Sequence, residues 1–297
     1  MRVFVTGASG WIGSAVVPEL QDAGHEVIGL ARSEESASAL AAAGVTAHRG
    51  SLDDLGSLRE GAAASDAVVH LAFNHDFSDY LGAGRTERAA IETIAGALEG
   101  SGRPLLFASG VALVQPGEVA TELMASGFSG PDSPRGGGEA LALSYADRGV
   151  LPVALRFAPT VHGEGDHGFT AAIAAVAKER GVSGYVGDGS SRWPAVHRLD
   201  AGTMVRLALE NASTGSIAHA VGEEGISAKQ IAEAIGAQLD LPVVSIAADD
   251  SAEHFGWIGR FFGLDIPASS ALTQQRLGWT PTHQGLLADI AAGYYTR

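Results

Sequence analysis

The first half of the chain alternates short apolar runs with longer stretches of helical character. Runs such as RVFVT near the N-terminus and AVVHLA near residue 70 have the length and composition of buried strands. The stretches between them are longer, and several are rich in alanine, which favours helices. The predicted strands are 2–6, 26–30, 45–49, 67–72, 105–109 and 152–157, and the predicted helices are one that ends near 23 and those at 35–43, 52–63, 81–98 and 136–148.

This alternation predicts the architecture. Strands that alternate with helices form a parallel sheet covered on both faces. We therefore predict an α/β protein with a doubly wound, parallel-sheet Rossmann domain at 1–160. Beyond residue 160 two Gly-rich loops, HGEGDHG and VGDGSSRWP, interrupt the rhythm. We expect a smaller, mostly helical substrate-binding domain at 161–297, with part of 195–222 returning to the first sheet. The helices expected there lie near 200–209, 227–239, 252–262 and 284–294.

A glycine-rich turn follows the first predicted strand. Gly7, Gly10 and Gly13 form the pattern G-x-x-G-x-x-G between that strand and a helix. The first glycine permits a tight turn, the second lets the backbone approach a pyrophosphate, and the third allows close packing of helix on strand. The helix N-terminus then offers N–H groups to the phosphate. An ordinary Gly-rich loop is the alternative, but the position favours a dinucleotide site. The residues assigned to it are Gly7, Ser9, Gly10, Trp11, Ile12 and Gly13.

The end of the second predicted strand indicates which dinucleotide binds. An NAD site usually places Asp or Glu there, where it binds the ribose 2′-hydroxyl. Here Arg32 and Ser33 end the strand, and the first carboxylate is Glu34. An Arg can clamp a 2′-phosphate and a Ser can donate to it. We therefore predict NADP(H), bound by Arg32 and Ser33. An arginine that is merely exposed is the alternative.

Composition narrows the classes of partner. The chain has 34 acidic and 19 basic side chains, which leaves a formal net charge of −15. Such a surface repels phosphate backbones and anionic lipids, so we expect neither nucleic acid nor a membrane as partner. The absence of Cys excludes thiolate catalysis and thiolate metal sites. With no long apolar run and no signal-peptide pattern, a cytoplasmic globular protein with a small-molecule substrate is expected.

The motifs together resemble a known family. TGASGWIG, AVVHLA, LLFASG, RFAPTVHG and WPAVHRLD are similar to those of extended or atypical short-chain dehydrogenases/reductases of the NAD-dependent epimerase/dehydratase type. The resemblance covers essentially the whole chain. It implies a cofactor across the strand ends, Ser109 near the reacting carbon, and helices near 84–100 and 136–148 that can pair two copies as a homodimer. Further implied cofactor positions are Ser51, Leu52, Leu71, Ala72, Phe73, Pro159 and Val161.

The sequence departs from this family at the catalytic dyad. The family normally uses a Tyr with a Lys four residues later, and the Lys lowers the pKa of the Tyr and holds the nicotinamide ribose. The two lysines of this chain are Lys178 and Lys229, and no Tyr has Lys at that spacing. Arg135 falls at the Lys position and Pro131 at the Tyr position. Arg135 can still hold ribose hydroxyls, but its high pKa makes it a poor proton relay.

Another group must therefore deliver the proton. The side chains near predicted strand ends that are able to do so are His75, Asp76, Tyr80, Ser109, His162 and His197. We name Ser109, His162 and His75 as candidate catalytic residues, together with Arg135 as a ribose or substrate-anion ligand. For each histidine, a hydrogen-bonded structural imidazole is the alternative.

The loop that contains His162 is expected to border the substrate pocket. His162 and His167 stand five residues apart in a Gly-rich loop, not four apart on a helix face, so no metal site is predicted. Asp188, Arg192 and Trp193 are expected either in the opposite wall or in an ordinary turn and core. The aromatic residues expected in the core, or as a lid over an apolar substrate, are Phe255, Trp257, Phe261 and Phe262.

These observations predict an NADP(H)-dependent oxidoreductase with a non-standard proton donor. Its substrate would be a carbonyl, or a related double bond, of a small and partly apolar metabolite. Two alternatives stay open. One is an epimerase or dehydratase that oxidises and re-reduces its substrate on a retained cofactor, and the other is a non-catalytic NADP(H)-binding sensor.

Overall fold

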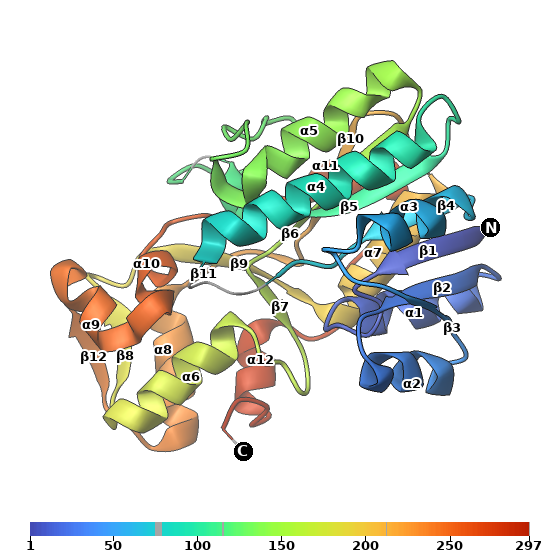
Figure 1. The fold of residues 1–297 in the computed structure, drawn as a ribbon. Helices are drawn as coiled ribbons and strands as arrows, with labels where there is room; N and C mark the ends of the chain where they lie inside the picture. Colours follow the sequence, from blue (N-terminus) through green and yellow to red (C-terminus); the bar gives the residue numbers. More distant parts are fainter. Residues whose placement is uncertain (75–78, 115, 212, 297) are drawn as a thin grey trace.

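The larger part of the molecule is a seven-stranded parallel sheet (Figure 1). The computed structural model describes residues 1–74, 79–114, 116–211 and 213–296. The strand order is β10-β6-β5-β4-β1-β2-β3, and every neighbouring pair is parallel. The strands are β1 (Arg2–Thr6), β2 (Glu26–Ala31), β3 (Thr46–Arg49), β4 (Ala67–His70), β5 (Pro104–Gly110), β6 (Leu151–Phe157) and β10 (Ser216–Ala220).

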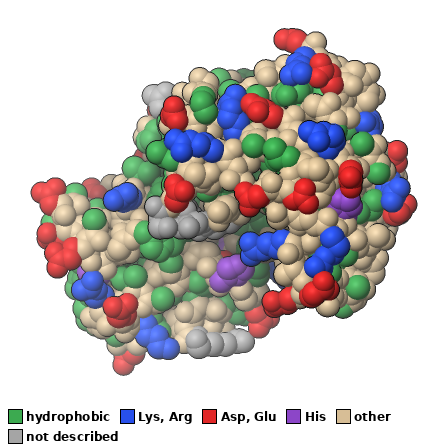
Figure 2. All heavy atoms as spheres, in the orientation of Figure 1, with side chains coloured by type: hydrophobic (Ala, Val, Ile, Leu, Met, Phe, Trp, Pro, Cys, Tyr) green, Lys and Arg blue, Asp and Glu red, His purple; other side chains and the backbone are tan. Residues whose placement is uncertain are grey.

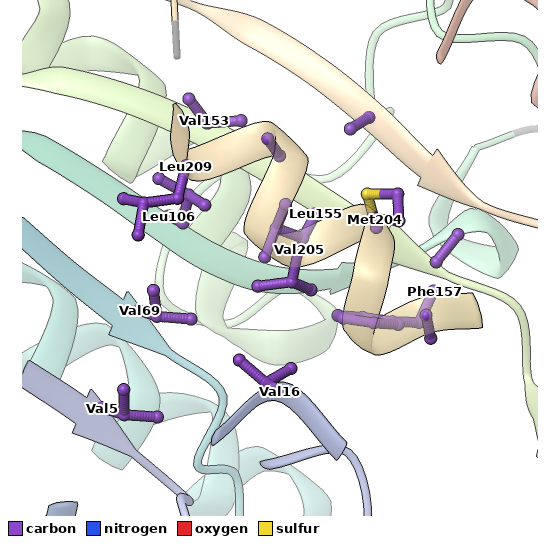
Figure 3. Packing of buried hydrophobic residues seen from close by; sticks show 14 of the residues in the cluster. Val5, Val16, Val69, Leu106, Val153, Leu155, Phe157, Met204, Val205 and Leu209 are labelled. Carbon is purple, nitrogen blue, oxygen red and sulfur yellow. The ribbon is translucent and has the colours of Figure 1, made fainter. Parts of the chain in front are cut away.

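Helices cover both faces of this sheet, so the predicted doubly wound architecture is confirmed. Along β1 the side chains alternate, because a pleated strand sends successive residues to opposite faces. Val5 packs into a core with α1 and α7, whereas Phe4 packs into a second core with α3 and α4. Figure 3 shows the first core, where Val16, Met204 and Val205 approach the sheet. The covering helices are α1 (Gly13–Asp22), α2 (Glu34–Ala42), α3 (Leu55–Ala63), α4 (Tyr80–Leu98), α5 (Gly138–Ser144) and α7 (Arg198–Glu210).

The rest of the chain packs around a third core that includes the buried Trp193 and Phe262. Helices predominate there, as expected, and two small sheets join them that the sequence analysis did not name. Their strands are only three to six residues long, so the pattern is not distinguishable from loops. The strands are β7 (Thr160–His162), β8 (Ser183–Val186), β9 (Arg192–His197), β11 (Glu223–Ser227) and β12 (Val243–Ile246). The helices are α6 (Phe169–Arg180), α8 (Ala228–Leu239), α9 (Ser251–Phe255), α10 (Gly259–Phe262), α11 (Ala271–Leu277) and α12 (Leu286–Ala291).

Two predicted helices are broken in the structure. The helix expected at 136–148 becomes α5 flanked by 3-10 turns at Pro134–Gly137 and Tyr145–Arg148. The cause is a left-handed backbone from Arg135 to Gly137, with φ between 52° and 61°. The helix expected at 252–262 divides into α9 and α10 where Gly256 has a φ of 63°.

Part of the second half returns to the large sheet. β10 pairs in parallel with β6, and α7 packs against α1. The division of the chain into two domains near residue 160 stays a prediction. Among the described residues, none of the helices combines the length and apolar character needed to span a membrane.

Candidate functional site

The connection between β1 and α1 is a tight glycine turn at the carboxyl edge of the sheet. Gly7 has a φ of +70°, and a Cβ on it would lie 2.9 Å from the backbone nitrogen of Ala72 and 3.0 Å from the carbonyl carbon of Leu71. A Cβ on Gly13 would lie 2.0 Å from the carbonyl oxygen of Gly7. Both glycine positions therefore exclude a side chain, and the ends of β1 and β4 meet at this turn.

The first turn of α1 presents backbone donors that the chain leaves unused. Among the described residues, the N–H groups of Trp11, Ile12 and Gly13 have no acceptor, and α1 lacks a side-chain cap. Ser9 and Gly10 beside them are exposed. Unpaired N–H groups at the positive end of a helix dipole bind phosphate. The turn therefore fits the pyrophosphate of a nicotinamide dinucleotide.

Trp11 links this turn to the second half of the chain. Its indole Nε1 donates to the carbonyl oxygen of Val161 at 2.7 Å. The Arg198 guanidinium carbon lies 4.7 Å from the centre of the Trp11 ring, and the His167 ring meets it edge-on at 5.7 Å. Arg198 also donates to Ser14 Oγ at 3.1 Å. Trp11 was predicted to lie in the turn, whereas no role was predicted for Arg198.

Two arginines lie at the adjacent ends of β2 and β3. Arg32 is exposed and, within the described residues, has no ion-pair partner. Ser33 is the N-cap of α2, and its hydroxyl oxygen accepts a hydrogen bond from the helix backbone. Arg49 ends the adjacent strand β3, donates to the carbonyl oxygen of Ser33 at 2.9 Å and pairs with Glu34 at 2.7 Å. Arg49 was not predicted as a cofactor residue, although the β2–β3 order of a parallel sheet would have placed it beside Arg32.

The other positions implied for the cofactor follow strands that end at the same edge. Parallel strands bring their carboxyl ends together, so residues far apart in sequence meet there. These positions are Ser51 and Leu52 after β3, Phe73 after β4, Pro159 between β6 and β7, and Val161 within β7. Val161 is buried and the others are partly buried.

Ser109 lies near the end of β5 in a buried polar network. Its hydroxyl donates to Glu139 Oε2 at 2.6 Å. Arg156 Nε donates to the same oxygen at 3.0 Å, and a second bond joins Arg156 to Glu139 Oε1. Arg156 also reaches the His219 ring at 3.4 Å. The hydroxyl proton of Ser109 is thus directed at a carboxylate that a buried arginine holds.

Arg135 is paired with Glu87, a buried residue of α4. Arg135 Nε donates to Glu87 Oε2 at 2.9 Å, and Nη2 bonds to Oε1. The guanidinium carbon lies 4.4 Å from the centre of the Phe73 ring. Burial raises the pKa of Glu87, and the adjacent Arg135 opposes that rise. Glu87 gave no signal in the sequence, because the pair joins residues 48 positions apart.

Two further titratable side chains lie close to Arg135. Burial raises the pKa of Tyr80, with Arg135 opposing, so the phenol stays protonated at neutral pH. Burial and then Arg135 lower the pKa of His70 to about 4, so its ring is neutral there. The Nε2 of His70 has no hydrogen-bond partner among the described residues.

Ser109 and Arg135 line one small cavity. Its volume of about 10 Å³ is room for roughly one water molecule. The cavity therefore accepts a small polar group and not a whole substrate. The residues around it are Glu87, Ala108, Ser109, Ser126, Phe128, Pro134, Arg135, Gly137, Gly138 and Glu139.

His162 lies in a different cluster. It is buried in β7, where its Nδ1 donates to Asp289 at 2.6 Å and its Nε2 is 3.9 Å from Glu223. Its ring meets the His197 ring edge-on at 5.4 Å. It is not among the residues that line the Ser109 cavity. The other histidine predicted as catalytic, His75, lies outside the described residues, as does Asp76.

The His162 cluster extends to the C-terminal region. The His197 ring stacks on that of His283 at 4.6 Å, and His283 bonds to Asp200 at 2.8 Å. Burial, followed by the neighbouring His162, lowers the pKa of His197. Within the part of the chain that the structure describes, no three His, Asp or Glu side chains form a group suited to hold a metal ion. These imidazoles are held by hydrogen bonds and by ring contacts.

The remaining pocket candidates lie mainly in structural positions. Asp188 accepts hydrogen bonds within its own turn, and Arg192 pairs with Asp265 at 2.8 Å. Trp257 is 43% exposed and meets the Phe169 ring edge-on at 5.5 Å. The aromatic side chains of the third core are those of Trp193, Phe255 and Phe262, with Phe261 packed against them.

Comparison with known proteins identifies the family. A family model described as the NAD dependent epimerase/dehydratase family matches residues 3–222. The chain belongs to this family. The matched residues include the glycine turn, nearly all of the large sheet and the Ser109 cavity. The epimerase/dehydratase family is nicotinamide-nucleotide dependent, in agreement with the fit of the turn.

Two full-length relatives and one solved structure extend the comparison. An uncharacterized protein of Schizosaccharomyces pombe is 50% identical over 99% of this chain and 100% of its own length. An uncharacterized protein of Saccharomyces cerevisiae is 45% identical over 99% of each chain. The Thermus thermophilus UDP-glucose 4-epimerase, solved with NAD, superimposes with a TM-score of 0.78 and 21% identity over 99% of this chain and 98% of its own. At that identity the structural likeness establishes the fold alone.

Proposed function

We propose that this epimerase/dehydratase-family protein is an NADP(H)-dependent oxidoreductase that reduces a carbonyl, or a related double bond, of a small and partly apolar metabolite. The observation that carries the cofactor choice is the pair Arg32 and Arg49 at the adjacent ends of β2 and β3. Two guanidinium groups beside the capped end of α2 suit a 2′-phosphate. The carboxylate nearby, Glu34, is already paired with Arg49.

The glycine turn and the neighbouring strand ends would hold the rest of the cofactor. The N–H groups of Trp11, Ile12 and Gly13 would bind its pyrophosphate. Once bound, the nicotinamide would supply the hydride for reduction. Arg135 uses two of its N–H groups on Glu87, so other donors are left for ribose hydroxyls. Since Glu87 balances its charge, we favour this role over binding a substrate anion.

The charged side chains around the Ser109 cavity favour an uncharged substrate. Its charged groups are paired, Glu87 with Arg135 and Glu139 with Arg156. An ionised substrate would therefore meet no uncompensated opposite charge. The wall includes Phe128, and the space suits a group of the size of a carbonyl oxygen. We infer that Ser109 orients that oxygen once its hydroxyl turns from Glu139 toward the substrate, because among the described residues it is the one predicted donor that lines the cavity.

The cofactor assignment is tested by measuring the Kd of NADPH and NADH by titration calorimetry. We expect the wild type to bind NADPH at least about tenfold tighter, since a charge-assisted hydrogen bond contributes about 1.5–3 kcal/mol. Arg32→Gln should reduce that preference and leave NADH binding unchanged. Arg59→Gln, an exposed position on α3, is the matched control. Equal affinity of the wild type for both cofactors would reject the NADP(H) assignment.

The proton-donor assignment is tested by turnover of NADPH with a panel of carbonyl compounds. Ser109→Ala should lower kcat by about 10²-fold or more, the usual contribution of a positioned acid–base group, with the Kd of NADPH unchanged. Ser126→Ala, in the same cavity, is the control. If His162→Ala lowers kcat and Ser109→Ala does not, the proton comes from the other cluster.

The family match also supports a second function, an epimerase or dehydratase that retains its cofactor. Such an enzyme would purify with tightly bound cofactor and show no net consumption of NADPH. A non-catalytic NADP(H) sensor would bind NADPH and NADP⁺ with different affinities and turn over no substrate. Stoichiometric oxidation of NADPH by any carbonyl compound excludes both alternatives.

A further inference from the structure

Arg198 contacts the phosphate-binding turn from a segment that follows the first six strands of the chain. It is the first residue of α7, which packs against α1. A Cβ on Gly202 would lie 2.8 Å from the carbonyl oxygen of Ala15, so the two helices approach very closely. This contact brings the N-terminal ends of α1 and α7 together. Arg198 then lies over the Trp11 ring and donates to Ser14 Oγ at 3.1 Å.

Within the part of the chain that the structure describes, the charge of Arg198 is not balanced by a carboxylate, since none lies within ion-pairing distance of it. Its neighbours are two helix N-termini, which carry partial positive charge and repel a cation. A guanidinium between two positive helix ends is unfavourable unless an anion binds there. Figure 2 shows basic side chains, coloured as Lys or Arg, beside a His at the hollow in the face of the molecule.

The residues around Arg198 hold it in place. The Trp11 indole is tied to β7 by its bond to Val161, so the aromatic face under the guanidinium is fixed. Ser14 Oγ donates to the Trp11 carbonyl oxygen at 3.0 Å, which leaves its lone pairs for Arg198. The bond to Ser14 uses one N–H of a group that has five. The others are available to a phosphate group above the turn.

We propose that Arg198 is a ligand of the cofactor pyrophosphate, supplied by α7 to the glycine turn of α1. This inference rests on the proposed dinucleotide site but not on the choice between NADP(H) and NAD(H). Under this proposal the basic residues bind different phosphate groups of the cofactor. Arg32 and Arg49 would recognise the 2′-phosphate, and Arg198 would bind the pyrophosphate that both cofactors share.

The experiment compares three ligands by titration calorimetry on the full-length protein. NADPH, NADH and ADP-ribose all carry the pyrophosphate, and ADP-ribose lacks both the nicotinamide and the 2′-phosphate. Arg198→Gln should raise all three Kd values about tenfold, and Arg198→Lys should raise them less because the charge remains. Arg32→Gln should raise the Kd of NADPH alone.

Arg206→Gln is the control for a merely structural role. Arg206 also ties α7 to α1, through Glu19 at 3.0 Å, but it lies two turns further along the helix. Its replacement should leave all three Kd values unchanged. If Arg198→Gln leaves ADP-ribose binding unchanged, or if Arg206→Gln weakens it equally, Arg198 is no pyrophosphate ligand. If the wild type binds ADP-ribose but does not prefer NADPH, the NADP(H) proposal fails while this test still stands.

Discussion

Among the described residues, the buried His70 has a hydrogen-bond partner at its ring nitrogen Nδ1 and none at Nε2. Its Nδ1 hydrogen-bonds with Thr6 Oγ1 at 2.7 Å, and the same hydroxyl oxygen accepts from the backbone of Ala72 at 3.2 Å. These contacts join the ends of β1 and β4 beside the glycine turn. Because burial and Arg135 lower its pKa to about 4, protonation of His70 opposes folding.

We expect acid to destabilise the protein partly through His70. The folded state binds this proton only near pH 4, whereas the unfolded chain binds it near the ordinary pKa of 6.5. Stability is therefore complete above pH 6.5 and is lost as the pH falls through this window. Between pH 7 and pH 5 the loss from His70 should be about 2 kcal/mol. Urea unfolding of the wild type and of His70→Gln measures it.

The variant should show a smaller fall in the free energy of unfolding over the same pH range. Its absolute stability can be lower, because the bond to Thr6 changes, so only the dependence on pH is diagnostic. The same pH dependence in both proteins would contradict the assignment. A His70 imidazole resonance that titrates near pH 6.5 in NMR spectra would contradict it too.

Arg135 illustrates how far the sequence predicts a single residue. By the family resemblance it is expected where the family has Lys, and no Tyr of the chain has Lys four residues later. Its left-handed backbone, its pairing with Glu87 and its contact with Phe73 are not readable from the sequence. A non-glycine residue in that conformation is strained, and strain of this kind persists where surrounding contacts hold it. The ion pair with Glu87 is such a contact.

At the scale of elements, one face of α4 is shaped to receive the Arg135 turn. Gly84 is buried there, and a Cβ on it would lie 2.7 Å from the backbone nitrogen of Gly136. Glu87 lies one turn further along and bonds to Arg135. The close approach of helix and turn therefore requires glycine at position 84. In the same helix, Gly96 is exposed, and a Cβ on it would meet no atom within 4 Å.

Replacing each of these two glycines of α4 by alanine should change the free energy of unfolding in opposite directions. Gly84→Ala should lower the free energy of unfolding by about 1–3 kcal/mol, because the methyl group meets backbone that cannot yield easily. Gly96→Ala should raise it by up to about 1 kcal/mol, since alanine favours the helix and meets nothing. Urea unfolding compares them directly. A stabilising Gly84→Ala would mean that the Arg135 turn moves freely.

The elements of the first half were predictable because their signals are local. Strand runs and the glycine pattern occupy adjacent residues, and all six predicted strands of the large sheet are present within a few residues of the expected bounds. The broken helix at α5 was not predictable, because GGG in a helical pattern does not show that the backbone turns left-handed there. The two small sheets were missed since their pairing is made between distant segments.

At the scale of the whole molecule, the net charge is −15, but several basic side chains are grouped near the proposed cofactor site. Arg32 and Arg49 lie at the ends of β2 and β3, and Arg198 reaches the glycine turn from the start of α7. An anionic cofactor approaching an acidic protein gains from such a local group of cations. The homodimer suggested by family resemblance, like the cytoplasmic location, stays a prediction.

The sequence by itself determined the doubly wound fold, the glycine turn and the lack of any Tyr with Lys four residues later, because each depends on residues close together in the chain. Only the tertiary structure decided how the charged and polar side chains pair. It joined Ser109 to Glu139, Arg135 to Glu87 and His162 to Asp289, across separations of 30, 48 and 127 residues. The physical reason is that a buried charge requires a partner, and packing determines which partner lies within reach.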